Sequence, residues 1–182
     1  MSSAREQLLG ILAAQSFRLG DFQLSSGGRS DYYVDCRTTT LDALGADPMV
    51  AAVAMLSAQE GQSRAEAGEE RRRAFVHGFL VRKAEKAHGT GQRIEGFQKK
   101  GARVVIVDDV CTTGASTVQA IEAAREAGFN IIGVLCLVER EEAGGRAAVE
   151  KAASTAPFLA IFRAAEVRHA HLRLKQEAAA AP

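Results

Sequence analysis

Residues 103–117 read RVVIVDDVCTTGAST, and this stretch decides the fold. It opens with an unbroken run of apolar, β-branched side chains and changes abruptly to two acids, Asp108 and Asp109. A continuous run of this kind predicts a strand that is buried on both faces, as in a parallel sheet. Because open α/β sheets bind ligands at the carboxyl ends of their strands, we expect the two carboxylates at a ligand-binding edge.

A loop of small and hydroxyl-bearing side chains follows the acids and leads into a predicted helix at 117–127. Val118, Ile121 and Ala124 supply the apolar face of this helix. Backbone N–H groups and hydroxyls at a helix N-terminus form an anion site, and phosphate is its usual occupant. Acids beside a phosphate cradle indicate a sugar phosphate. The plainer interpretation is a buried strand that ends in two solvated acids before a capped helix.

The composition indicates one globular domain. The chain has 182 residues, of which 47% are hydrophobic and 25% charged, with a formal net charge of +1. This balance gives no support for nucleic-acid or anionic-membrane binding as the main role, and no apolar run approaches a membrane span. Cys36, Cys111 and Cys136 are odd in number and lack metal-ligand spacing. They argue against zinc and disulfides and favour a cytoplasmic location.

Periodicity and turn residues divide the rest of the chain into alternating elements. Segments 103–108, 117–127 and 130–138 form a predicted βαβ unit, which should be right-handed with parallel strands. The other predicted elements are helices at 4–14 and 46–58, a β-hairpin within 17–35, and strands at 74–82 and 157–163. The alanine-rich tail from about 175 is expected to fray.

A second motif lies at 81–96, which reads VRKAEKAHGTGQRIEG. Arg82, Lys83, Lys86 and His88 precede its glycine-rich half. A loop of this composition suits closure over an anionic ligand, since Arg and Lys can neutralise a pyrophosphate and His can exchange a proton near neutral pH. Taken alone, a charged loop is more often a solvated surface.

Four motifs in this chain resemble one enzyme family. The stretch 104–117 resembles the phosphoribosyl-pyrophosphate signature of the type I phosphoribosyltransferases. Within that group, RKxxKxHGxGxxIEG resembles the mobile catalytic loop of the orotate phosphoribosyltransferase family, and FxLSSGGRSDYYVDCR at 22–37 resembles its N-terminal hood. The fourth motif is LVEREE at 137–142. The resemblance implies an α/β fold with a mostly parallel central sheet flanked by helices, and a small hood over the base site.

The resemblance also implies roles for the matched residues. Asp108 and Asp109 would hold the ribose 2′ and 3′ hydroxyls, directly or through Mg²⁺. The 5′-phosphate would lie in the loop of Thr112, Thr113, Gly114, Ala115, Ser116 and Thr117, with Thr112 also near the base. The pyrophosphate would meet Arg82, Lys83, Lys86 and His88, of which Lys86 and His88 are expected to matter most for rate.

Arg140, within the fourth motif, occupies the place of the family's arginine that grips the orotate carboxylate. A planar guanidinium suits a planar carboxylate, so the chemistry supports this role. Considered alone, Arg140 could equally form a surface ion pair with Glu139 or Glu142.

The implied reaction joins orotate to phosphoribosyl pyrophosphate, giving orotidine 5′-monophosphate and pyrophosphate in pyrimidine biosynthesis. The family's loop reaches into the partner subunit, which implies a homodimer that shares loop 82–95. Two alternatives stay open. The chain could be a phosphoribosyltransferase for another base, or a non-catalytic, regulatory protein that binds phosphoribosyl pyrophosphate.

The chain departs from the family between Leu41 and Leu44, where relatives carry an additional helix and core strand of roughly thirty residues. An unseen stretch of chain, a genuine deletion or a compensating rearrangement would each explain the shortening. The shortening affects the expected activity more than the family assignment.

The domain organisation follows from the length and the motifs. We expect one domain over 1–182, comprising an N-terminal helix and hood (1–40), an α/β core (41–174) and the tail (175–182).

Overall fold

The computed structural model describes residues 4–24, 27–40, 77–82 and 93–180. Its N-terminal part contains α1 (Ala4–Ile11), which continues into a π-helical segment (Leu12–Ser16). Strands β1 (Phe17–Gln23) and β2 (Arg29–Val34) pair antiparallel, and α2 (Arg37–Thr40) follows. The hairpin that turn residues predict within 17–35 is therefore confirmed.

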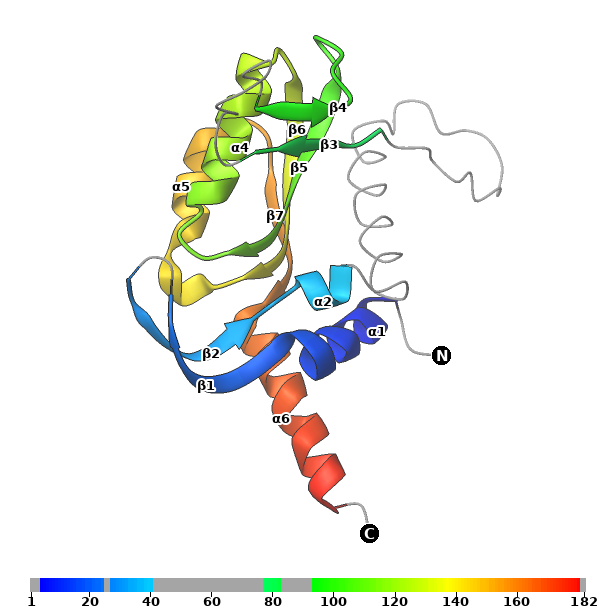
Figure 1. Ribbon diagram of the computed structural model, residues 1–182, viewed down its shortest axis with the longest axis vertical. Coiled ribbons are helices and arrows are strands. Elements are labelled where there is room, and N and C mark those ends of the chain that lie inside the picture. The colour runs from blue at the N-terminus through cyan, green and yellow to red at the C-terminus, as the bar shows by residue number, and fades with distance from the viewer. Residues whose placement is uncertain (1–3, 25–26, 41–76, 83–92, 181–182) are drawn as a thin grey trace, which may run out of the picture.

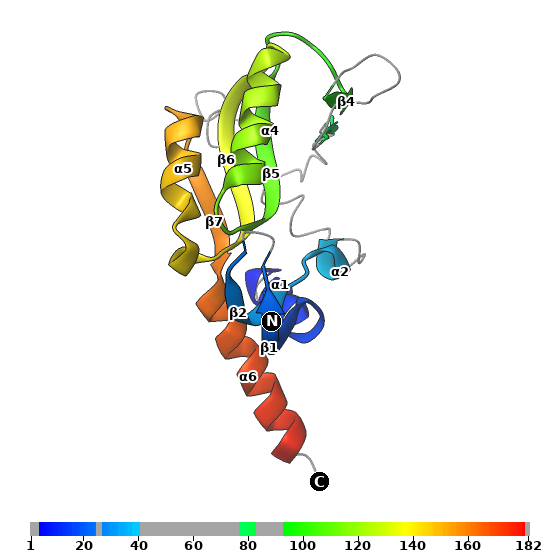
Figure 2. The same cartoon turned by 60° about the vertical axis from the view of Figure 1, so that its left-hand side comes forward.

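The core is a parallel three-stranded sheet with the order β5-β6-β7. The chain passes through it as β5 (Arg103–Cys111), α4 (Ala115–Glu126), β6 (Asn130–Glu139), a 3₁₀ turn (Glu141–Ala143), α5 (Gly145–Ala153), β7 (Phe158–Arg163) and α6 (Ala164–Ala180). Helices α4 and α5 lie side by side against one face of the sheet (Figures 1 and 2). The parallel sheet flanked by helices agrees with the sequence prediction.

Strands β3 (Phe79–Val81) and β4 (Ile94–Gly96) form a separate antiparallel pair beside α4 and β5. Phe79 and Phe97 pack near Phe129, which follows α4, so aromatic contacts attach this pair to the core. It brings Arg82 and Arg93 to a cavity that β5 also lines.

Two apolar clusters meet in β6. Val134 and Cys136 belong to the cluster beneath α4 and α5, while Leu137 and Val138 belong to a second cluster formed with α1, the hairpin and α6. A fully buried aliphatic side chain contributes about 1.5–3 kcal/mol, so the second cluster is a substantial anchor. The hairpin consequently lies across the carboxyl ends of the strands, where a hood would cover a bound ligand (Figure 1).

Several elements differ from the sequence prediction. Strand β5 continues three residues beyond 108 because its ladder with β6 extends to Cys111, opposite Glu139. Helix α4 begins two residues before 117, and β3 is shorter than 74–82. Helix α6 runs through Ala180, so the tail is helical to that point.

The helix expected at 46–58 and the shortening near 41–44 lie outside the described residues. Within the parts of the chain that the structure describes, no helix combines the length and apolar character needed to cross a membrane.

Candidate active site

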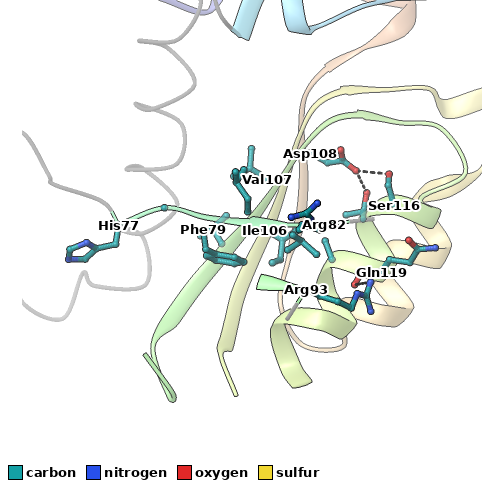
Figure 3. A pocket seen from close by; sticks show the side chains of 15 residues that line it. His77, Phe79, Arg82, Arg93, Ile106, Val107, Asp108, Ser116 and Gln119 are labelled. Atoms are coloured by element: carbon teal, nitrogen blue, oxygen red, sulfur yellow. Dashed lines mark hydrogen bonds between the residues drawn. The ribbon is translucent and has the colours of Figure 1, made fainter. Parts of the chain in front are cut away.

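Asp108 links the end of β5 to the start of α4. Its Oδ2 atom accepts hydrogen bonds from the hydroxyls of Ser116 (3.1 Å) and Thr117 (Figure 3). Thr117 is fully buried, so this side of the carboxylate is built into the fold. The other oxygen, Oδ1, accepts from the Asp109 backbone N–H at 3.0 Å. The hydroxyls of the predicted phosphate loop thus hold the acid that precedes it.

Asp109 is set up differently. Its side chain is exposed, but neighbouring protein atoms partly desolvate it, and this desolvation together with the charge of Asp108 raises its pKa above the ordinary aspartate value. Its Oδ1 accepts from the Val110 backbone N–H at 2.7 Å, which favours the ionised form. A nearby cation or hydroxyl donors would therefore stabilise the ionised form of the Asp109 carboxyl group.

The loop between β5 and α4 turns at Gly114, whose φ of +75° is a conformation that glycine adopts without strain. Gly114 also offers no capping side chain, so nearby ligands can approach the first N–H groups of α4. Because α4 begins at Ala115, Ser116 and Thr117 stand in its first turn, and Thr112 and Thr113 precede the turn. The six residues predicted to cradle a phosphate therefore form one loop and helix start.

Gly145, at the start of α5, supports this loop and was not predicted from the sequence. A Cβ atom at Gly145 would lie 2.3 Å from the Thr112 carbonyl oxygen and 2.7 Å from the Gly114 nitrogen. Only a residue without a side chain allows α5 to approach so closely. The pair Gly144-Gly145 was the available signal.

Arg140 follows β6 and lies beside the end of β5, since its backbone N–H donates to the Cys111 carbonyl at 2.9 Å. Its side chain is buried. The Nε atom donates to the Tyr32 hydroxyl (2.9 Å) and to Glu142 Oε1 (3.0 Å), and Nη2 donates to Ser30 Oγ (2.9 Å). The ion pair with Glu142 therefore exists, and it joins a guanidinium that is 8% exposed to a carboxylate side chain that is 54% exposed.

Sequence reasoning named Glu142 as a possible partner of Arg140 but missed Ser30 and Tyr32. Along β2, burial alternates strictly, and Ser30, Tyr32 and Val34 face inward. This alternation within the hood motif was the signal that could have found Ser30 and Tyr32. Glu139 does not pair with Arg140: it binds Arg146, whose Nε donates to Glu139 Oε1 at 2.8 Å.

A cavity of about 410 Å³ opens between β3, β5 and α4 (Figure 3). Its polar lining includes Arg82, Arg93, Asp108, Ser116 and Thr117. Arg82 donates to Glu95 at 2.6 Å, which holds the guanidinium at the end of β3. The structure thus brings the first cation of the loop motif to the same cavity as Asp108.

Of the remaining predicted cations, Arg140 lines a second cavity, and three are not described by the structure. Lys83, Lys86 and His88 lie outside the described residues. Arg140 lines a second cavity of about 350 Å³ between β2 and the start of α6, together with Arg29 and Arg168. Among the residues that the structure describes, no group of three His, Cys, Asp or Glu side chains could hold a metal ion.

Comparison with known proteins agrees with this arrangement. Residues 76–156 match the phosphoribosyl transferase domain family. The orotate phosphoribosyltransferase of Thermosynechococcus vestitus is 35% identical over 193 residues, covering 92% of this chain and 94% of that protein.

Solved structures give the same result. The Mycobacterium tuberculosis H37Rv orotate phosphoribosyltransferase in complex with inorganic phosphate is 26% identical, with a TM-score of 0.65 and coverage of 90% of this chain and 98% of that one. The same enzyme in complex with 5-phospho-α-D-ribosyl 1-diphosphate shares the fold at 24% identity, with a TM-score of 0.63 and coverage of 91% and 99%.

The alignment with the Thermosynechococcus vestitus protein also bears on chain length. It spans 193 positions, whereas 92% of 182 residues is about 167, so about 26 positions have no residue in this chain. This shortfall is similar in size to the one that the sequence predicts near 41–44. The alignment nevertheless covers 94% of that relative's length. The chain belongs to the orotate phosphoribosyltransferase family.

Proposed function

We propose that this protein transfers the ribose 5-phosphate group of phosphoribosyl pyrophosphate to orotate, giving orotidine 5′-monophosphate and pyrophosphate in pyrimidine biosynthesis. The main support is that the carboxyl ends of β5 and β6 lie next to each other. The hydrogen bond from the Arg140 backbone N–H to the Cys111 carbonyl oxygen puts Arg140 beside β5, the strand that bears Asp108 and Asp109. A sugar-phosphate site and a carboxylate-binding guanidinium therefore share one edge of the sheet.

Asp108 and Asp109 would accept from the ribose 2′ and 3′ hydroxyls, directly or through Mg²⁺. The network around Asp108 supports this role, since Ser116 and Thr117 fix the position of its carboxylate. The loop 112–117 would receive the 5′-phosphate on the first N–H groups of α4. Arg140 would hold the carboxylate of orotate, as its buried guanidinium is suited to a bidentate anion.

In the reaction, the bond between ribose C1 and the pyrophosphate oxygen breaks while a bond between C1 and orotate N1 forms. Orotate N1 gives up its proton, and the leaving pyrophosphate carries away the electron pair. Charge therefore builds on the pyrophosphate as the ribose becomes oxocarbenium-like. Arg82, Lys83, Lys86 and His88 would stabilise that charge, and loop closure would keep water from the activated ribose.

Mg²⁺ would be held by the ligand's oxygens with Asp108 and Asp109 behind them, which suits a cation that prefers carboxylate, phosphate and water oxygens. The raised pKa of Asp109 fits this arrangement, because a nearby cation would favour its ionised form. When bound, the ion would neutralise charge on the pyrophosphate.

The protein would act as a cytoplasmic homodimer whose loop 82–95 reaches the partner's site. The β3–β4 pair places Arg82 and Arg93, the residues that flank 83–92, beside the cavity that contains Asp108.

A spectrophotometric assay with orotate, phosphoribosyl pyrophosphate and Mg²⁺ tests the proposal. Loss of orotate absorbance is expected with wild type, and Lys86→Ala should lower kcat about 100-fold, the typical cost of removing one transition-state donor. Lys175→Ala, on the exposed end of α6, is the matched control and should retain full activity. Equal rates for Lys86→Ala and wild type would refute the role of the loop.

Because this chain lacks about 26 of the aligned positions, a second function is a non-catalytic protein that binds phosphoribosyl pyrophosphate. Calorimetric binding of this ligand without turnover of any base would select that function. Turnover of a purine or uracil in place of orotate would select a phosphoribosyltransferase of different specificity.

A further inference from the structure

We propose that Tyr32 is a positioning residue for base recognition, which fixes the guanidinium of Arg140 before the base arrives. The inference rests on the proposed function and adds a specificity element to it. The hood is then more than a cover over the base site, because one of its side chains sets the geometry of the residue that reads the base.

Tyr32 contacts Arg140 in two ways at once. Its hydroxyl accepts from Arg140 Nε at 2.9 Å, and its ring lies under the guanidinium, with 4.3 Å between the guanidinium carbon and the ring centroid. The hydroxyl restricts rotation of the guanidinium in its plane, while the ring restricts its tilt. A single side chain therefore determines both aspects of its orientation.

Tyr32 is itself held in place. Its ring stacks on Phe17 with centroids 5.2 Å apart, and its hydroxyl donates to the Glu142 carboxylate. Ser30, two residues earlier on the same face of β2, donates to the Tyr32 carbonyl at 2.7 Å and accepts from Arg140 Nη2 at 2.9 Å. The strand thus holds two edges of the guanidinium through neighbouring inward-facing residues.

The protonation states agree with this network. Burial and the hydrogen bond to Glu142 raise the pKa of Tyr32 to about 12, so the hydroxyl keeps its proton near neutral pH. Burial of Glu142 opposes its ionisation, but the hydrogen bonds from Tyr32 and Arg140 outweigh this effect and lower its pKa. A neutral phenol can then donate to Glu142 and accept from Arg140 at the same time.

The restrained guanidinium faces the cavity of about 350 Å³ that Ser30, Tyr32 and Arg140 line together. A flexible arginine would have to lose rotamer freedom when the base binds, and this cost weakens binding. A pre-oriented guanidinium has already lost that freedom on folding. The base should therefore bind more tightly because of Tyr32, even though Tyr32 need not touch the reacting atoms.

Steady-state kinetics on the full-length protein test this inference. Tyr32→Phe keeps the ring but removes the hydroxyl, and it should raise the KM for orotate about tenfold, as expected for the loss of one charged hydrogen bond. We expect kcat and the KM for phosphoribosyl pyrophosphate to stay within twofold of wild type. Tyr33→Phe is the matched control: the neighbouring tyrosine is exposed, packs against Phe22, and should leave all three constants unchanged.

A double-mutant cycle separates positioning from a general structural role. On an Arg140→Ala background, Tyr32→Phe should have no further effect on the KM for orotate, because the group that it positions is gone. Ser30→Ala should also raise this KM, and Ser30→Thr, which restores a hydroxyl, should recover part of the loss.

The outcomes distinguish this inference from the proposed function. An active wild type with an unchanged orotate KM in Tyr32→Phe overturns the positioning role alone. Equal increases in the KM of both substrates, with a lowered Tm, would also contradict it, since they would indicate a purely structural role. A wild type without orotate turnover overturns the proposed function and this inference together.

Discussion

Gly145 and the carbonyl oxygen of Thr112 are so close that a Cβ atom at Gly145 would lie 2.3 Å from that oxygen. This contact joins the start of α5 to the loop that follows β5. Gly114 completes the junction, since a Cβ there would lie 2.9 Å from the Gly145 carbonyl oxygen. The backbones of the proposed phosphate loop and α5 thus pack directly on one another, and their shape depends on two glycines.

Gly145→Ala should displace this loop, because backbone atoms on both sides of the new methyl group leave it no room. We expect the KM for phosphoribosyl pyrophosphate to rise about tenfold or more and the Tm to fall. Steady-state kinetics and thermal unfolding would measure both. Gly10→Ala is the control: Gly10 lies in α1 with no atom within 4 Å of its Cβ position, so this change should stabilise the protein by about 0.5–1 kcal/mol. Normal substrate kinetics in Gly145→Ala would contradict the role of the junction.

Asp109→Asn should stabilise the free protein while it impairs the reaction. The folded-state pKa of Asp109 lies above its unfolded value, so holding it ionised at pH 7 costs stability. We expect a Tm increase of about 1–2 °C and a fall in kcat of about 100-fold. The stability gain should vanish as the pH falls below roughly 3.9, where the unfolded-state carboxyl is also protonated. A lower Tm at pH 7 would contradict this account.

Arg146→Ala should destabilise the protein, because it leaves the Glu139 carboxylate buried without its partner. The Glu139 side chain is only 4% exposed, whereas Arg146 is 42% exposed. We therefore expect a loss on the order of 2 kcal/mol, below the 3–5 kcal/mol typical of a fully buried pair. Urea unfolding measures the change. Glu150→Ala removes only the exposed partner of Arg146 and should cost less than about 0.5 kcal/mol. Similar losses in both variants would argue against a buried-charge effect.

The three cysteines should be unreactive toward thiol reagents in the native protein. Burial raises the pKa of Cys111 to about 11 and of Cys36 to about 12, and it raises that of Cys136 further. At pH 7.5 we expect slow labelling by iodoacetamide and rapid labelling of all three thiols in urea. Rapid modification of one thiol in the folded protein would contradict its buried, protonated state.

The same shifts predict a loss of stability at alkaline pH. A thiol whose folded-state pKa is raised contributes its full stability below the unfolded value, 9.0 for Cys36, and loses it as the pH approaches the folded value. Urea unfolding should therefore show decreasing stability between about pH 9 and pH 12. Replacing Cys36 by Ala should flatten this decrease, and an unchanged pH profile would exclude Cys36 as a cause.

Local sequence patterns predicted most of the elements that carry the site. The β-branched run predicted β5, because a strand buried on both faces leaves an unbroken apolar pattern. The hairpin followed from alternation and its glycine turn. Helices α5 and α6 were not predicted. Helix α5 does have a helical period, since Gly145, Val149 and Ala153 are buried at four-residue spacing, but two of these three residues are small, and the pattern was missed; the helix packs against α4 and β7.

The sequence by itself determined the family and the acidic strand end and predicted the phosphate loop, because each depends on residue types at fixed spacing in one continuous stretch. Only the tertiary structure decided which side chains hold Arg140. Its partners Ser30 and Tyr32 stand more than a hundred residues earlier in the chain, and folding the hood onto the end of β6 brings them together. Contacts of this separation arise from packing of the two apolar clusters, which no local spacing records.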